Sequence, residues 1–430
     1  MSTPPPPPAP RSPALRRLRA LPAERFPELL SPGERLFLPG SAAEVPALLE
    51  ALQARGGPAL RITSSFVPGI NPTPLERLPP GTEYSALFAQ ASAPGDQARG
   101  ALRHLPLSYG AAARWIGQVA RFDACVMTVA PPDAAGRCSL GLAVEFAPLA
   151  RRRSSRLILV VNPAMPAIPG AASVALDEAD AVIEAEAAPR EYDVGAPSAA
   201  AGAIAARIAA LVEDGAAIQI GLGKVPDALM GLLTDRRNLR LHSGMLSDGA
   251  RRLVEAGALA PGHRPVSCVH VGTRAYYDWL AGRDGFDVVD CEATHTPQAL
   301  ARVPGLVAVN SALEVDLFGQ ANLELLGARA ISGVGGAPDF ARAAALDPGG
   351  VSVVALPATS GRGAVSRIVP RLSGLASLPR GDVEVVVTEH GLADLRGLST
   401  IERAERLIEV AAPDHRPALA EAWRAMAAAL

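Results

Sequence analysis

Short apolar runs alternate with segments of helical periodicity along most of the chain. The run at residues 35–38 is followed by a Pro-Gly turn and then by Ala and Leu at helical spacing, as far as Gly56 and Gly57. Later apolar runs in this half lead into Pro, Gly or Asn, as strands do where they end at loops. They cover residues 59–72, 123–133 and 156–166, and the helical stretch 109–120 lies among them.

The same alternation starts again after residue 195. A small-residue connector leads into a long Ala, Ile and Leu helix that ends near residue 211, and strand-sized runs follow at 216–220, 265–272, 306–319, 350–357 and 383–391. Alternating strands and helices predict an α/β fold of two open domains, each with a mostly parallel sheet and helices on both faces. We expect a disordered Pro-rich leader at residues 1–25, an N-terminal domain at 26–194 and a C-terminal domain at 195–430.

Composition narrows the classes of function. Hydrophobic residues make up 49% of the chain, charged residues 20%, and the formal net charge is −2. A soluble folded protein fits these values, whereas a nucleic-acid partner would call for a basic surface. No apolar run reaches the roughly 18 residues of a membrane span, and no secretory signal precedes the first domain, so we expect a cytoplasmic protein without a membrane partner.

The four cysteines occur singly. Cys125, Cys138, Cys268 and Cys291 form no C-x-x-C pair and no spacing typical of zinc sites. We therefore expect reduced thiols and no metal site.

A glycine turn at residues 221–224 contains the only lysine of the chain. The apolar run that ends at Ile220 is followed by Gly221, Gly223 and Lys224 and then by a helical segment with Pro226 in its first turn. Free backbone N–H groups at such a helix start favour anionic or polarised oxygen, and glycine permits close approach of a ligand. A dinucleotide fingerprint would need a third glycine where Pro226 stands, so a nicotinamide cofactor is disfavoured.

A second glycine turn lies at residues 331–344. Gly333, Gly335 and Gly336 precede a helix predicted to start near Pro338, with Asp339 in its first turn. Ligands of open α/β sheets bind beyond the carboxyl ends of the strands, so two such turns in one domain predict a ligand cleft there.

Eight segments, taken together, resemble the acetyl-CoA hydrolase/transferase family, which includes the 4-hydroxybutyrate CoA-transferases. They occur in family order from about residue 30 to the end, and they are residues 129–146, 160–170, 218–230, 241–257, 309–324, 331–344, 366–372 and 386–397. The resemblance implies a two-domain α/β enzyme that binds an acyl-CoA and a small carboxylate, with no cofactor beyond coenzyme A. A homodimer is left open.

The resemblance also assigns roles to the glycine turns. Gly221, Gly223 and Lys224 would border the CoA site, with the lysine near an anionic part of the ligand. Gly335 and Gly336, in the same loop as Gly333, would place backbone N–H groups to stabilise a thioester oxyanion.

The family's nucleophile is missing from the motif that should carry it. Transferases of this family use a glutamate that attacks the thioester and becomes first an acyl anhydride and then a glutamyl-CoA thioester. That glutamate follows His-Thr or His-Ser and precedes Met, but here residues 241–249 read LHSGMLSDG, which places Gly244 at the position.

Three interpretations remain open. Another carboxylate could act as the nucleophile, with Glu292, Glu314 and Glu389 as candidates in the second half. Water could replace the glutamate, with a general base among His242, Asp248 and His295, which would give hydrolysis of a thioester or of a carbon–carbon bond. The chain could also bind a CoA ester without turning it over.

Overall fold

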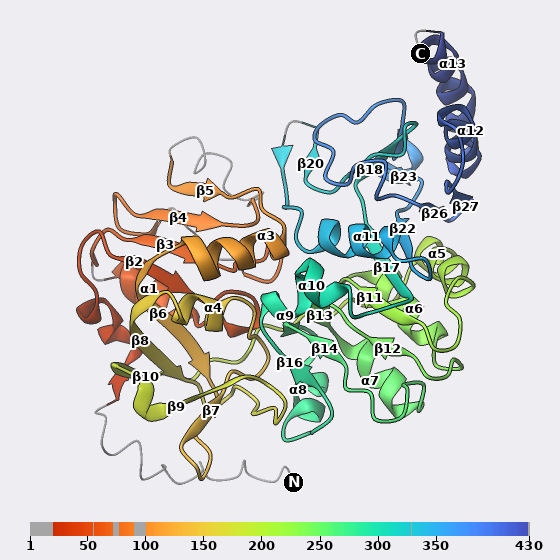
Figure 1. The fold of residues 1–430 in the computed structure, drawn as a ribbon. Helices are drawn as coiled ribbons and strands as arrows, with labels where there is room; N and C mark the ends of the chain where they lie inside the picture. The colour runs from red at the N-terminus through yellow and green to blue at the C-terminus, as the bar shows by residue number, and fades with distance from the viewer. Residues whose placement is uncertain (1–19, 55, 72–76, 90–99, 328, 429–430) are drawn as a thin grey trace, which may run out of the picture.

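The computed structural model describes residues 20–54, 56–71, 77–89, 100–327 and 329–428. Two α/β lobes lie side by side, the first coloured red to yellow and the second green to blue (Figure 1). Within the described residues, no helix has the length and apolar character to cross a membrane.

The first lobe is built on one parallel sheet. Its strands are short and mostly buried because helices and loops cover both faces, as is usual for parallel sheets. In spatial order the strands are β1 (Leu21–Pro22), β10 (Ala181–Glu184), β8 (Ser154–Val161), β6 (Phe122–Val129), β2 (Arg35–Leu38), β3 (Arg61–Ser64), β4 (Glu83–Ala86) and β5 (Leu102–His104). The helices of this lobe are α1 (Pro46–Ala54), α3 (Tyr109–Arg114), which continues as a π-helical turn over Trp115–Val119, and α4 (Ala147–Arg151).

The second lobe has a sheet that is parallel except at one edge. Its strands are β12 (Arg240–Leu241), β11 (Ala217–Ile220), β17 (Leu306–Ser311), β22 (Val351–Ala355), β26 (Val385–Thr388) and β27 (Gly391–Asp394), of which only the last pair is antiparallel. Its helices are α5 (Ala199–Ala209), α6 (Lys224–Leu232), α7 (Asp248–Glu255), α8 (Arg274–Leu280), α9 (Cys291–His295), α10 (Pro297–Leu300), α11 (Ala337–Leu346), α12 (Thr400–Val410) and α13 (Arg416–Ala427).

Alternate residues of β11 and β17 pack on opposite faces of this second sheet. Ile218 and Ile220 of β11 belong to the cluster that includes Ile204 and Ile208 of α5. Ala217 belongs to a separate cluster with residues of α11. Because side chains alternate along a strand, helices cover both faces of this sheet, and the predicted fold class is confirmed.

The predicted leader extends too far. Residues 1–19 lie outside the described structure, but Leu21–Pro22 pair with β10 and residues 23–29 form a 3₁₀ helix whose Phe26 is fully buried. The prediction of disorder is therefore wrong for residues 21–25, because the apolar side chain of Phe26 anchors this segment to the first sheet.

Small two-stranded ladders and α9 join the lobes. β13 (Met245–Leu246) pairs with β15 (Val269–His270), and β14 (Val266–Ser267) pairs with β16 (Asp287–Val288). Helix α3 of the first lobe packs on α9 of the second, and both lie where the lobes meet (Figure 1). The position of Gly244, directly before β13, thus lies close to the junction.

Candidate functional site

The first glycine turn lies at the carboxyl end of β11, and its glycines face open space. The backbone of Gly223 has a φ of 125°, a conformation that favours glycine. A Cβ added at Gly221 would meet no atom within 4 Å, so a ligand can approach this backbone closely. Lys224, the first residue of α6, is exposed to solvent.

The Gly244 position is held directly beside this turn. The Ser243 hydroxyl donates to the carbonyl of Ile220 at 2.7 Å and accepts from the Ile220 N–H at 3.3 Å. In addition, the N–H of His242 donates to the carbonyl of Ile218 at 3.1 Å. Two segments that are more than twenty residues apart in sequence therefore form one edge of the site.

The second glycine turn packs against the first lobe. A Cβ at Gly333 would lie 2.2 Å from the carbonyl oxygen of Leu87, and a Cβ at Gly336 would lie 2.5 Å from Nε2 of His295. Gly335 has a φ of 56°, and its carbonyl accepts from the N–H of Tyr109 at 3.0 Å. Close approach to the first lobe at Gly333 and to His295 at Gly336 thus explains these two glycines structurally, and the role of this turn as an oxyanion donor stays a prediction.

The imidazole of His295 fills the space beside Gly244. A Cβ added at Gly244 would lie 2.7 Å from Nε2 of His295 and 3.7 Å from the ring of Phe340. His295 is 1% exposed, and its ring packs between Tyr109 and Phe340, with ring centres at 5.1 and 4.8 Å. A glutamate side chain at residue 244 and this histidine ring would compete for the same volume.

His295 is neutral, and its two ring nitrogens face different neighbours. Burial, together with the nearby His242, lowers the pKa of His295 to about 3. Nδ1 lies 2.7 Å from Oγ1 of Thr294, and this hydroxyl is also 3.3 Å from the carbonyl oxygen of Asp290. Nε2 lies on the side of Gly244.

The other candidate bases have structural partners. Nε2 of His242 lies 3.0 Å from the carbonyl of Thr294, and burial lowers its pKa. Asp248 accepts from the N–H of Thr273 at 3.0 Å and from its hydroxyl at 2.6 Å, which fixes the start of α7.

The candidate carboxylates also lie in structural contacts. Glu292 forms an exposed ion pair with Arg152 at 2.7 Å. Glu314 accepts from Asn322 and Ser373, and Glu389 accepts from the N–H of Ala358. Of all the proposed bases and nucleophiles, His295 has the contacts that place it at Gly244, with His242 beside it.

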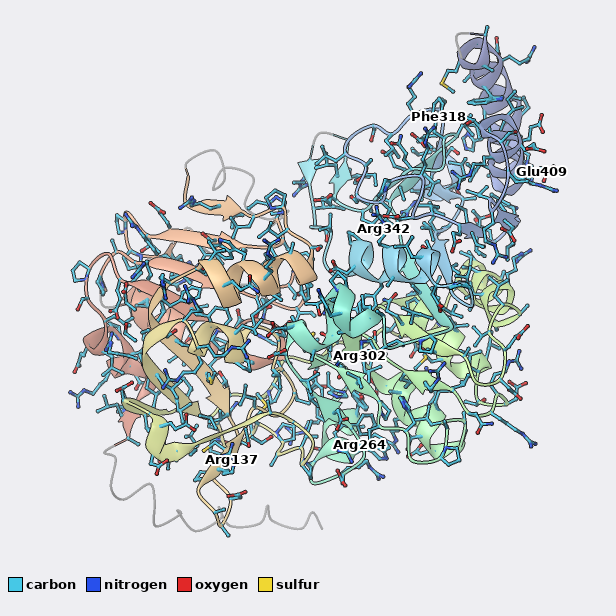
Figure 2. All side chains as sticks on the ribbon, in the orientation of Figure 1. Arg137, Arg264, Arg302, Phe318, Arg342 and Glu409 are labelled. Carbon is cyan, nitrogen blue, oxygen red and sulfur yellow. The ribbon has the colours of Figure 1, made fainter. Side chains whose placement is uncertain are left out.

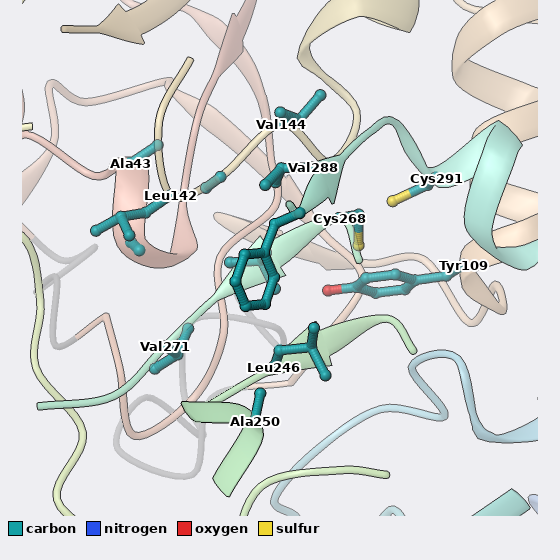
Figure 3. Close-up of a cluster of buried hydrophobic side chains, with 14 of the residues drawn as sticks. Ala43, Tyr109, Leu142, Val144, Leu246, Ala250, Cys268, Val271, Val288 and Cys291 are labelled. Atoms are coloured by element: carbon teal, nitrogen blue, oxygen red, sulfur yellow. The ribbon is translucent and has the colours of Figure 1, made fainter. Parts of the chain in front are cut away.

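Two cysteines complete a buried group at this position. Sγ of Cys268 lies 2.9 Å from the carbonyl oxygen of Gly244. The ligand atoms of Cys268, Cys291 and His295 all lie within 4.8 Å of one another, and Figure 3 shows both cysteines beside the ring of Tyr109. The fold thus brings both cysteines beside His295, and the expectation of no metal site stays a prediction.

One sequence signal for this group was available. Cys291 and His295 are four residues apart on α9, so they project from the same face of the helix. Cys268 comes from the junction of β14 and β15, which no pattern places opposite that helix. Burial and the neighbouring thiol raise the pKa of Cys291 well above its usual range.

Glu145 and Tyr109 of the first lobe meet the same group. The N–H of Glu145 donates to the carbonyl of Cys268 at 3.2 Å, and its carbonyl accepts from the N–H of Cys291 at 2.9 Å. Burial raises the pKa of Glu145 to about 8, against the lowering effect of a hydrogen bond from Ser65. Sequence reasoning missed both Glu145 and Tyr109, since neither lies in a polar motif.

Two cavities flank the segment formed by α9 and α10. The first, about 590 Å³, is lined by His295, Pro338, Asp339 and Arg342 together with apolar side chains. The second, about 610 Å³, is lined by His242, Glu292 and Arg302. Arg342 and Arg302 lie on opposite sides of α10 (Figure 2). Space for a small substrate therefore exists on either side of the segment that carries His295.

Asp339 ties α11 to the first lobe at the rim of the first cavity. Its carboxylate accepts from the Ser108 hydroxyl at 2.7 Å and from the N–H of Gly110 at 2.9 Å. Burial raises the pKa of Asp339 to about 6.

This fold and this site define a two-lobed α/β protein of the CoA-transferase type. The family model for the acetyl-CoA hydrolase/transferase C-terminal domain matches residues 272–423. The 4-hydroxybutyrate coenzyme A transferase of Clostridium kluyveri is 35% identical over 306 residues, which are 69% of this chain and 71% of the relative. The succinyl-CoA:cyclohexane-1-carboxylate CoA transferase of Geobacter metallireducens is 32% identical and covers 71% of each chain.

A solved structure extends the likeness to nearly the whole chain. RipA from Yersinia pestis superposes with a TM-score of 0.87 at 30% identity and covers 96% of this chain and 98% of its own. The chain belongs to the acetyl-CoA hydrolase/transferase family.

Proposed function

We propose that this enzyme transfers coenzyme A between an acyl-CoA thioester and a small carboxylate. One observation carries the proposal: Ser243 binds both backbone groups of Ile220 and so holds the Gly244 position against the open turn of Gly221 and Lys224. A CoA thioester bound along that turn would present its carbonyl to Gly244. The two transferases named above support the same reaction class.

Gly244 changes how transfer must proceed. Without a glutamate at this position, the carboxylate of the acceptor attacks the thioester carbonyl, which forms a mixed anhydride and releases the CoA thiolate. The thiolate then attacks the acceptor's carbonyl and expels the first acid as a carboxylate. Backbone N–H groups at the start of α6 and the charge of Lys224 favour the negative oxygen that develops in each step.

This mechanism predicts a distinct kinetic pattern. An enzyme with a glutamate nucleophile forms a covalent CoA intermediate, so its two half-reactions proceed separately. Direct attack by the acceptor instead needs both substrates bound together. We therefore expect sequential kinetics, and we expect no exchange of labelled CoA into acyl-CoA in the absence of a carboxylate.

The test mixes the purified protein with acetyl-, butyryl-, 4-hydroxybutyryl- and succinyl-CoA, with and without acetate. New acyl-CoA species and free thiol are measured in the same sample. Acceptor-dependent formation of a new acyl-CoA is the expected result. The absence of exchange across the panel would overturn the proposal, and exchange without an acceptor would overturn the direct mechanism.

A matched pair of variants tests where CoA binds. Gly221→Ala adds a methyl group that meets no protein atom, and Gly231→Ala does the same on the exposed side of α6. We expect Gly221→Ala to raise the KM for acyl-CoA at unchanged thermal stability, and Gly231→Ala to leave both unchanged. Equal KM values for the two variants would place CoA elsewhere.

Hydrolysis is the second candidate, and the position of His295 favours it. Nε2 of His295 lies beside Gly244, within reach of a water there, while the lowering of its pKa to about 3 makes it a weak base. Thiol release without a new acyl-CoA would support this activity over transfer. CoA binding without either signal would indicate a binding protein.

The cellular setting follows from the same reasoning. The four cysteines are buried free thiols, which is typical of proteins in a reducing compartment. We place the enzyme in the cytoplasm, where it would act on diffusible acyl-CoA and carboxylate substrates, with no nucleic-acid or membrane partner. Fractionation of cells that express the untagged protein tests this location.

A further inference from the structure

The group formed by Cys268, Cys291 and His295 has the chemistry of a soft metal site. Their ligand atoms lie within 4.8 Å of one another, and all three residues are buried. In a tetrahedral zinc site, bonds of about 2.3 Å to sulfur and about 2.1 Å to nitrogen set ligand spacings of under about 4 Å. Small inward rotations of the three side chains would therefore close the group around one ion.

The histidine is already oriented as a ligand. Metal-binding histidines usually donate the proton of their second ring nitrogen to a neighbouring acceptor, which fixes the tautomer. Here Nδ1 lies 2.7 Å from the Thr294 hydroxyl, which can accept its proton, and Nε2 lies on the side of Gly244. A hydrogen-bond partner for the second ring nitrogen is thus present beside the cysteines.

If the Cys268 thiol lost its proton, the carbonyl oxygen of Gly244 would still accept other hydrogen bonds. The carbonyl of Gly244 accepts from the Cys268 thiol, but it also accepts from the backbone N–H groups of Cys268 at 3.0 Å and of Val269 at 3.2 Å. Replacement of the thiol proton by a metal ion would therefore leave no buried polar atom without a hydrogen bond.

Glu145 packs beside the three residues without being one of the group whose ligand atoms lie within 4.8 Å of one another, and its Oε2 accepts from the Ser65 hydroxyl at 2.7 Å. Oε1 of Glu145 is buried and makes no hydrogen bond, as is also true of the Tyr109 hydroxyl. Glu145 interacts electrostatically with Cys291 and Tyr109, and its backbone bonds to both cysteines. Its φ of 41° is a strained conformation for a residue with a side chain, and such strain is concentrated at functional sites.

We propose that Cys268, Cys291 and His295 bind one zinc-type divalent cation beside Gly244. Two thiolates and one imidazole are ligands that Zn²⁺ accepts, and catalytic zinc sites keep the fourth position of the tetrahedron for water or substrate. A substrate oxygen at that position would place a positive charge next to the carbon that is attacked. The bound metal would then assist the reaction at the position where the family's glutamate side chain is missing.

The experiment measures metal content, so it does not depend on the transfer proposal. Reduced, chelator-treated protein is incubated with Zn²⁺, desalted and assayed by elemental analysis, and a second sample is loaded with Co²⁺. We expect one ion per chain, a thiolate-to-cobalt charge-transfer band in the near ultraviolet, and a rise in Tm with Zn²⁺ for the unmodified protein.

Variants connect the signal to these residues. Cys291→Ser should abolish the charge-transfer intensity contributed by its sulfur and weaken Zn²⁺ binding more than tenfold. Cys138→Ser is the matched control, since Cys138 is equally buried but lies in β7 (Arg137–Ser139), outside the group. Failure of the unmodified protein to retain Zn²⁺, or equal loss in Cys138→Ser, would overturn the proposal.

Discussion

Gly244→Glu tests whether His295 occupies the space that a glutamate at this position would need. The first atom of the new side chain would lie 2.7 Å from Nε2 and 3.0 Å from Cε1 of His295, well inside contact distance. The ring cannot simply withdraw, because Tyr109 and Phe340 pack on it. We therefore expect the substitution to destabilise the protein before any effect on chemistry is considered.

The size of the effect follows from the contact. Overpacking of a well-filled interior costs about 1 to 3 kcal/mol. For domains of this size, each kcal/mol lowers Tm by about 2 to 4 °C, so we expect a decrease of about 2 to 12 °C. Differential scanning calorimetry measures it. The control is Gly231→Glu on the exposed side of α6, where the added side chain meets open space and Tm should not fall.

A double-mutant cycle isolates the contact. His295→Ala removes the ring, and in that background Gly244→Glu should cost less than it does alone, with a coupling of at least about 0.5 kcal/mol. The double variant would also present a carboxylate at residue 244, which mass spectrometry can test for a covalent CoA adduct. Additive effects of the two substitutions would refute the inference that one residue fills the other's place.

Three further predictions follow from single contacts. Gly333→Ala should lower Tm, because its Cβ would lie 2.2 Å from the backbone oxygen of Leu87, whereas Gly381→Ala should not, because nothing lies within 4 Å. Lys224→Ala should raise the KM for acyl-CoA, measured at low salt, and leave Tm unchanged. Burial raises the pKa of Asp339 to about 6, so its protonated form favours the folded state. Its contribution, up to about 3 kcal/mol, is complete below about pH 4 and lost as the pH rises to about 6, and Asp339→Asn should remove this dependence from Tm measured against pH.

Much of the fold could be predicted from local patterns. The buried strands β6, β8, β17 and β22 are continuous apolar runs that end in turns, and α11 begins near Pro338, as predicted. These elements are recognisable because parallel strands covered on both faces need no polar positions. Short edge strands such as β1 carry no such signal, and β1 forms where the sequence pattern predicted disorder.

The candidate site was predicted only in part. The turn at Gly221 and Lys224 could be recognised because strand, turn and helix are consecutive in sequence. The packing role of Gly333 and Gly336 could not, because their partners lie on other segments that only the folded chain brings near. The same limit applies to Cys268 and Glu145, whose proximity depends on how the two lobes pack.

The presence of glycine at residue 244, where the family has glutamate, was visible in the sequence, but its effect on the packing of the site was not. A missing side chain in a packed interior should leave a cavity, which costs stability in proportion to its volume. Here His295 and Phe340 fill the space, so the site retains its packing with different chemical groups. A neutral imidazole and two thiols therefore lie together beside Gly244. The metal and exchange assays together decide which chemistry they support.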